Sequence, residues 1–140
     1  MDIRETAHET GSRREKALLL GFKEQKGDLL NSDESLKELE ELAKTANADI
    51  AAKLVIGVRR PDPAYYLGKG KVKELSFYCR QESIDLVIFD DELSPRQQNN
   101  LQEDMGCNVI DRTALILQIF ADRAKTKEGR LQVELAQLNY

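Results

Sequence analysis

The sequence contains no tryptophan, one histidine and two cysteines among its 140 residues. The cysteines, Cys79 and Cys107, have neither the spacing of a metal site nor the density of a disulfide scaffold, so we interpret both as small buried side chains in a reducing compartment. The histidine, His8, lies in a polar N-terminal stretch, and no Ser/His/Asp or Cys/His arrangement can be assembled. These scarcities exclude a disulfide-stabilised domain and the common nucleophilic hydrolases.

Long apolar runs and a strong net charge are also absent. No segment approaches the roughly 20 apolar residues that a membrane-spanning helix needs, and Met1–Lys16 lacks the apolar centre of a secretory signal, so we expect a cytoplasmic protein. The 21 basic and 25 acidic residues give a net charge of -4. Any contact with nucleic acid must therefore come from a local basic patch.

Four short apolar segments have the composition of β-strands that are covered on both faces. They are residues 17–22, 50–57, 84–89 and 107–110. Segments with a helical pattern lie between them, and this alternation is typical of right-handed crossovers between parallel strands. The predicted fold class is α/β, with a small parallel four-stranded sheet, helices on both faces and a long helical arm at the end.

The helices are predicted from their caps and their apolar spacing. The first is capped by Ser32 or Asp33. The second follows the stretch Gly68–Lys71 and buries an apolar face that contains Val72, Leu75 and Cys79. The third begins at Ser94, which is followed by a proline, and stops at Gly106.

A last helix is expected to begin at Asp111 or Thr113 and to continue past Tyr140, so that the chain would be part of a longer protein. The expected organisation is a flexible tail over residues 1–15, an α/β subdomain over 16–111 and the truncated start of a helical, coiled-coil subdomain over 112–140. An apolar stripe of this helix, made of Leu131, Leu135 and Leu138, would support a homodimer if it were exposed.

Ligands of parallel sheets bind beyond the carboxyl ends of the strands. The candidates for nucleotide or anion binding at that rim are Arg59, Arg60, Gly68, Lys69, Gly70, Lys71 and Asp90. The Gly-Lys-Gly-Lys stretch could offer backbone N–H groups and two ammonium groups to a phosphate, but it lacks the hydroxyl that holds magnesium in a P-loop. The alternatives are a turn in which the glycines adopt positive φ and, for Asp90 and Asp91, carboxylates that form turns and caps.

A basic run in the last helix is the second candidate for binding polyanions. It consists of Arg123, Lys125, Lys127 and Arg130, whose charges could displace counterions from RNA phosphates. The alternative is an exposed helix surface with a bend at Gly129. Tyr65 and Tyr66 are candidates for stacking on bases, although half-buried loop tyrosines are the more ordinary interpretation.

Four stretches closely resemble the N-terminal domain of the HflX family of ribosome-associated GTPases. They are Tyr66–Lys71, Phe89–Leu101, Val109–Ala124 and Glu128–Leu138. The resemblance implies an α/β subdomain followed by an antiparallel pair of long helices, a glycine-rich linker and a GTPase domain, and this chain would end inside the first of those helices. Without a P-loop the chain itself is not expected to hydrolyse GTP or to hold a cofactor, whereas the parent would be a GTPase that uses GTP and Mg²⁺.

For the whole protein, the resemblance implies binding to the large ribosomal subunit and its RNA, and dissociation of stalled ribosomes. The basic run would then begin the arm that faces RNA, and the downstream GTPase domain would be the other partner. The family is also associated with ATP binding in its N-terminal half, which would fall on the rim candidates. The two alternatives to docking are therefore an ATP-binding module with weak ATPase activity and a protein–protein interaction module.

Overall fold

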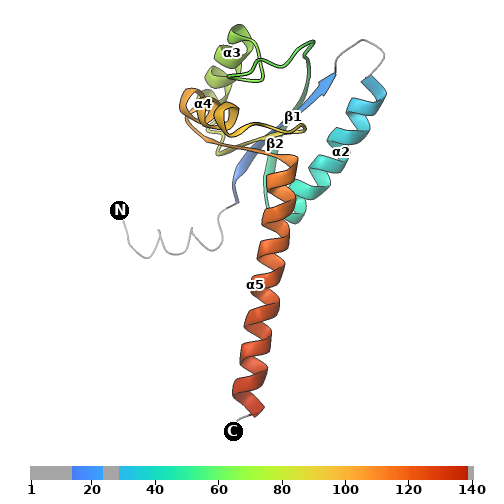
Figure 1. Cartoon of the computed structure of the whole chain (residues 1–140), viewed down its shortest axis with the longest axis vertical. Helices are drawn as coiled ribbons and strands as arrows, with labels where there is room; N and C mark the ends of the chain where they lie inside the picture. Colours follow the sequence, from blue (N-terminus) through green and yellow to red (C-terminus); the bar gives the residue numbers. More distant parts are fainter. Residues whose placement is uncertain (1–13, 24–28, 139–140) are drawn as a thin grey trace.

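The computed structural model describes residues 14–23 and 29–138, of which 29–31 and 130–138 are described by their backbone alone. Strands and helices alternate along the chain as the sequence predicts (Figure 1). The elements are β1 (Lys16–Lys23), α2 (Leu29–Thr45), β2 (Asp49–Gly57), α3 (Lys69–Gln81), β3 (Leu86–Phe89), α4 (Pro95–Met105), β4 (Asn108–Asp111) and α5 (Arg112–Leu138).

The four strands form one parallel sheet with the order β2-β1-β3-β4, which confirms the predicted fold class. β1 is central, because Leu18 pairs with Ala52 of β2 on one side and with Val87 of β3 on the other. The chain moves outward from β1 to β2 and then returns to the opposite side of β1 through α3. The strand order therefore reverses between β1 and β3, which is the switch point where sheets of this kind usually bind ligands.

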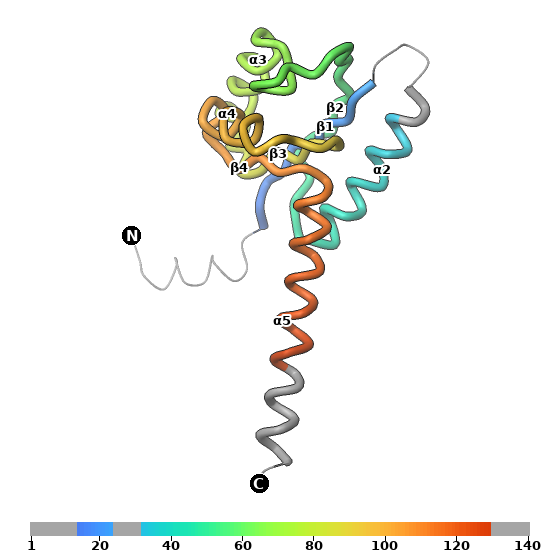
Figure 2. Tube along the Cα trace, in the orientation of Figure 1, coloured from blue at the N-terminus to red at the C-terminus, as the bar shows by residue number. Residues whose placement is uncertain are grey.

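Two apolar clusters hold the helices on opposite faces of the sheet (Figure 2). Side chains alternate along β1, so that Leu18 and Leu20 face α3 and α4, while Ala17 and Leu19 face α2 and α5. All four of these side chains are fully buried. Because both faces are covered, the central strands can be apolar at every position, which is why their sequences contain continuous runs rather than alternation.

The start of α2 differs from the prediction. The helix begins at Leu29 and not at a cap formed by Ser32 or Asp33. The Ser32 hydroxyl instead donates a hydrogen bond of 2.8 Å to the carbonyl of Phe22 in β1. A side chain that satisfies a strand carbonyl has replaced the expected local cap, and no sequence pattern distinguishes the two uses of serine.

The ends of α4 confirm the sequence prediction. Ser94 accepts a bond from the backbone N–H of Gln97, and the Gln97 side chain accepts one from the backbone N–H of Ser94, which together form a capping box. Gly106 ends the helix with φ of 69°, a left-handed conformation that glycine adopts without steric cost. Leu101 and Met105 anchor the helix in the core.

The Gly68–Lys71 stretch is helical rather than a turn. Gly68 occupies the N-cap position of α3 with φ of -68°, and Gly70 and Lys71 belong to the first helical turn. Among the described glycines only Gly106 has a positive φ, so the expectation that Gly68 and Gly70 would adopt one is wrong. The helix buries Val72, Leu75 and Cys79, as predicted.

The last helix, α5, is 27 residues long and extends away from the sheet (Figure 1). Asp111 caps it, because its Oδ1 accepts a bond of 2.9 Å from the backbone N–H of Ala114. The helix continues through Gly129 without interruption in the described backbone. Within the described residues no helix has the length and apolarity required to cross a membrane.

Candidate functional site

The switch point between β1 and β3 is filled by aromatic side chains. Phe22, Tyr66 and Phe89 pack on one another with ring centroids 4.8 to 5.7 Å apart. Tyr66 is only 5% exposed and its hydroxyl donates to the carboxylate of Asp91. The ring of Tyr66 is therefore part of the core and has no free face for stacking on a base, whereas Tyr65 is half-buried.

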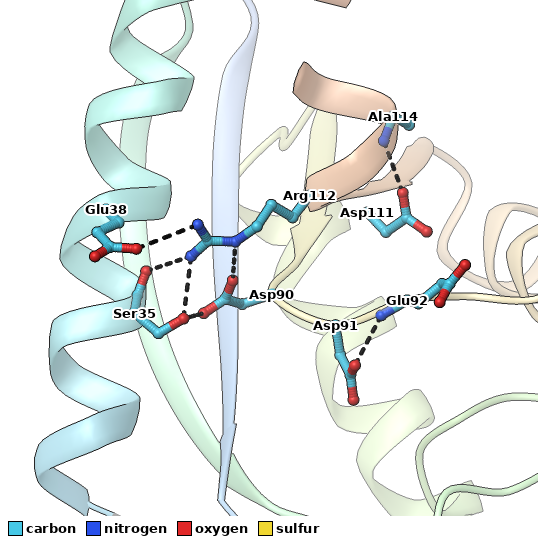
Figure 3. Close-up of polar contacts among 8 residues, drawn as sticks. All are labelled: Ser35, Glu38, Asp90, Asp91, Glu92, Asp111, Arg112 and Ala114. Atoms are coloured by element: carbon cyan, nitrogen blue, oxygen red, sulfur yellow. Dashed lines mark hydrogen bonds and ion pairs between the residues drawn. The ribbon is translucent and has the colours of Figure 1, made fainter. Parts of the chain in front are cut away.

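Asp90 follows β3 at the same rim and is bound by groups of the protein itself (Figure 3). One carboxylate oxygen accepts a bond of 2.6 Å from the Ser35 hydroxyl of α2, and the other accepts a bond of 2.7 Å from Nε of Arg112. The side chain of Asp90 is 4% exposed. Both oxygens have a protein donor, as a buried carboxylate requires.

Arg112, the first residue of α5, completes this network. Its Nη2 donates to the Ser35 carbonyl at 2.7 Å and to the Ser35 hydroxyl at 3.0 Å, and Nη1 lies 3.5 Å from a carboxylate oxygen of Glu38. A planar guanidinium with several donors can bind three groups at once, which lysine cannot. The network joins α2, the end of β3 and the start of α5, and thereby fixes the direction of α5 relative to the sheet.

The two neighbouring aspartates also have structural partners. Asp91 accepts from the Tyr66 hydroxyl and from the backbone N–H of Glu92, and Asp111 accepts from the backbone N–H groups of Leu93 and Ala114. These bonds support the interpretation of the acidic rim as turn-forming and capping carboxylates. In the described part of the chain, no three His, Cys, Asp or Glu side chains are grouped so that they could hold a metal ion.

The cationic rim candidates are separate from Asp90. No hydrogen bond or ion pair within the described residues joins Asp90 to Arg59, Arg60, Lys69 or Lys71. Lys71 pairs instead with Glu74 on the next turn of α3, at 3.0 Å. The predicted nucleotide site is therefore divided into an acidic part, which the protein itself occupies, and a basic part on α3 and the loop before it.

That basic part contains a small pocket. Tyr65, Lys69, Val72, Lys73 and Asp104 line a volume of about 190 Å³ at the start of α3. Lys73 was not among the sequence candidates, although its spacing of four residues from Lys69 places both on one side of the helix. In the described structure neither ammonium group has an ion pair or a hydrogen bond to a protein group.

The basic run of α5 is divided between sides of the helix. Arg123 and Lys127, four residues apart, line an open groove of about 510 Å³ with Thr45 of α2. Ile119, Asp122 and Thr126 complete the lining of that groove. Lys125 is exposed on a different side, and the side chain of Arg130 lies outside the described set. A polyanion that contacts the groove would reach Arg123 and Lys127 together but not Lys125.

An exposed apolar face of α5 was missed by the sequence analysis. Leu117 is 62% exposed and Phe120 is 60% exposed, whereas Leu115 and Ile119 of the same helix are buried against the sheet. Leu117 is two residues from both Leu115 and Ile119 and so lies on another side of the helix, and apolar residues on several sides of a helix do not show by their pattern alone which side is covered. The stripe predicted from Leu131, Leu135 and Leu138 lies outside the described side chains.

The two cysteines have no site-like character. Cys79 is buried and Cys107 is half-buried, and both belong to the apolar packing between α3 and β4. A hydrogen bond with the Cys79 thiol, together with burial, raises the pKa of Cys107. A thiol with a raised pKa is a poor nucleophile, so Cys107 has the properties of a packing residue, as the sequence predicts.

Comparisons with known proteins identify the family. The family model described as GTP-binding GTPase N-terminal matches residues 33–121. GTPase HflX of Escherichia coli K12 is 46% identical over 108 residues, which cover 76% of this chain and 25% of that protein. GTPase HflX of Caldanaerobacter subterraneus is 49% identical over 108 residues, which cover 77% of this chain and 25% of that protein.

Solved structures agree with this assignment. The structure of SsGBP with GDP is 26% identical, superposes with a TM-score of 0.57, and is matched over 91% of this chain and 35% of that chain. The chain spans about a quarter of the length of the HflX relatives named above. It therefore belongs to the GTP-binding GTPase N-terminal family and corresponds to the N-terminal part of HflX proteins.

Proposed function

We propose that this chain is the RNA-docking domain of an HflX-type GTP-binding protein that associates with the large ribosomal subunit and splits stalled ribosomes. GTP and Mg²⁺ would act in a GTPase domain outside this chain, since the relatives are named GTPases. In this proposal the chain binds and orients, and the catalytic chemistry takes place elsewhere. Its partners are ribosomal RNA and the GTPase domain.

The observation that carries the proposal is the way in which α5 is fixed. Asp111 caps its first turn, and Arg112 ties that turn to Asp90 and to Ser35 of α2. The helix then extends away from the sheet (Figure 1) and carries the exposed cations Arg123 and Lys127. A long helix with a fixed base and exposed cations is suited to placing a basic surface against phosphates at a distance from the domain.

Sedimentation of the chain with purified large ribosomal subunits tests the proposal. We expect binding at low salt that falls steeply as salt is added, because each phosphate contact releases counterions. The double variant Arg123→Glu/Lys127→Glu should weaken binding by roughly tenfold or more. A matched variant, Lys37→Glu/Arg96→Glu, makes the same change in net charge on α2 and α4 and should leave binding nearly unchanged.

Two results would contradict the proposal. One is the absence of binding to large subunits at low salt. The other is binding that does not respond to salt or that weakens equally in both double variants. Small subunits serve as the second control, since docking on the large subunit predicts little binding to them. ATP binding at Gly68–Lys71 stays a prediction, and saturable binding of labelled ATP below millimolar concentration would support it.

A further inference from the structure

Positive charge is concentrated in one segment of an acidic chain. Residues 58–80, which form the loop after β2 and most of α3, contain six basic and two acidic residues. The basic residues are Arg59, Arg60, Lys69, Lys71, Lys73 and Arg80. The segment thus has a net charge of +4 in a chain whose net charge is -4, so the rest of the chain is strongly acidic. Such a separation of charge produces a local surface that attracts polyanions.

The outer side of α3 joins this charge to an exposed aromatic ring. Lys69, Lys73 and Phe77 follow one another at intervals of four residues and therefore lie on one side of the helix, over about 12 Å of its axis. Phe77 is 64% exposed, although α3 has a complete apolar face buried against the sheet. Folding therefore gives no reason for a phenylalanine at this position.

The first turn of α3 contradicts the usual electrostatics of a helix. It contains Lys69 and Lys71 and no acidic residue, and Gly68 provides no side-chain cap. Cations at a helix N-terminus oppose the helix dipole and cost stability. Features that break a local folding rule without a structural gain are expected where the surface has a function.

We propose that the α3 surface, made of Tyr65, Lys69, Lys73 and Phe77, binds an unpaired segment of RNA. Lys69 and Lys73 would contact phosphates, since their ammonium groups have no partner within the described residues. Phe77 would stack on an extruded base, and Tyr65, half-buried in the same pocket as the two lysines, would cover the edge of the strand. The inference rests on the proposed RNA docking and adds a contact surface on the side of the sheet opposite to α2 and α5.

Fluorescence anisotropy with a labelled, unpaired oligoadenylate tests the surface on the whole chain. Phe77→Ala should weaken binding by about fivefold to 150-fold, the range measured when a stacking ring is removed. Lys73→Glu should weaken binding roughly tenfold and reduce the dependence on salt. The matched control Lys37→Glu makes the same change in net charge on α2 and should change affinity by less than about twofold, since α2 covers the opposite face of the sheet and salt screens distant charges.

A duplex RNA of the same length separates stacking from charge. It should bind more weakly, and Phe77→Ala should leave its affinity unchanged, because paired bases offer no free face. The proposal is overturned if Phe77→Ala does not affect the unpaired RNA, or if Lys73→Glu and Lys37→Glu have equal effects. It is also overturned if Phe77→Ala spares RNA binding but prevents association with a purified GTPase domain, which would make α3 a protein interface.

The same variants distinguish this inference from the proposed function. If the chain binds large ribosomal subunits and the α3 variants bind them equally well, the α3 surface is wrong and docking through α5 stands. If the unaltered chain binds neither large subunits nor the oligonucleotide, RNA docking itself is wrong. Circular dichroism and thermal unfolding of each variant establish that a loss of binding is not a loss of folding, since the side chains of Lys73 and Phe77 are exposed.

Discussion

The helices α2 and α3 cover opposite faces of one sheet and differ in the sides that face water. Their inner sides are alike, since Leu36 and Leu39 of α2 and Val72 and Leu75 of α3 are all buried. Their outer sides are opposite in charge. α2 contains five acidic and two basic residues, whereas α3 contains four basic residues and one acidic residue.

The charges on the two helices also differ in how they are paired. Lys44 of α2 pairs with Glu40 and Glu41, and Lys53 of β2 pairs with Glu40 at 2.9 Å. The hydrogen bond from Lys53 lowers the pKa of Glu40, and the charge of Lys44 adds to the effect. On α3, by contrast, Lys69 and Lys73 have no such partner in the described structure.

This comparison separates what folding requires from what it leaves free. The sheet requires an apolar inner side on each helix, and both sequences provide it. Folding does not specify the sign of charge on the outer side. The difference between an acidic α2, whose Glu40 and Glu41 are paired with lysines, and a basic α3, whose Lys69 and Lys73 have no partner within the described residues, therefore carries information about partners rather than about stability.

The largest expected effect tests the claim that the inner sides are equivalent. Leu39→Ala and Leu75→Ala should each reduce the free energy of unfolding by about 3 kcal/mol, because each removes a buried side chain and leaves a cavity. Denaturant titrations would measure both. Leu117→Ala, at a side chain that is 62% exposed, is the control and should cost less than about 0.5 kcal/mol. A large difference between the two buried leucines would break the equivalence.

A somewhat smaller effect on the free energy of unfolding is expected for the network of Arg112, Asp90 and Ser35, which attaches α5 to α2. Arg112→Ala should reduce the free energy of unfolding by about 2–3 kcal/mol, because Asp90 is 4% exposed and would keep a buried charge with only Ser35 as a donor. Arg112→Lys should recover only part of the loss, since lysine lacks the planar fork. The outcome that would contradict this role is full stability in the alanine variant.

The helices α3 and α4 pack on the same face of the sheet and differ in the capping of their first turns. The cap of α4 should contribute about 1 kcal/mol to the free energy of unfolding. Ser94→Ala removes the capping box of α4 and should lower the free energy of unfolding by about 1 kcal/mol. Thermal unfolding would show the change as a lower midpoint. Ser94→Asp, which keeps an acceptor at the N-cap, is the matched control and should restore most of the stability.

The smallest expected effect concerns the first turn of α3, which lacks the side-chain cap that α4 has. Gly68→Asp should stabilise α3 by a few tenths of a kcal/mol, because it supplies a cap and a negative charge at the helix N-terminus. The substitution causes no strain, since Gly68 has a φ of -68° and a Cβ there would meet no atom within 4 Å. RNA binding should weaken at the same time. A variant that gained stability without any loss of RNA affinity would argue that the unusual start of α3 has no connection with binding.

Much of the fold could be predicted because its signals are local. Continuous apolar runs indicate strands covered on both faces, and Ser94, Gly106 and Asp111 mark helix ends that the structure confirms. The φ of Gly68 was predicted wrongly, because glycine is also compatible with an ordinary helix start. The burial of Tyr66 could not be predicted for a similar reason, since a tyrosine in a loop can be buried or available for stacking.

The candidate site could be predicted only in part because its contacts are distant in sequence. Ser35 lies 55 residues from Asp90 and 77 residues from Arg112, so no spacing rule connects them. Asp90 was singled out as a ligand for nucleotides, yet both of its oxygens bind protein groups. The exposure of Phe77, by contrast, follows from the predicted buried face of α3, because Phe77 is two residues from both Leu75 and Cys79 and therefore lies on another side of the helix.

Photo-crosslinking on the large ribosomal subunit tests the contrast between α2 and α3 most directly. A benzophenone amino acid would replace Phe77 on α3 in one variant and Lys37 on α2 in another, both at exposed positions. The proposed orientation predicts that position 77 crosslinks to ribosomal RNA and that position 37 does not. RNA crosslinks of equal yield from both positions, or from position 37 alone, would contradict it.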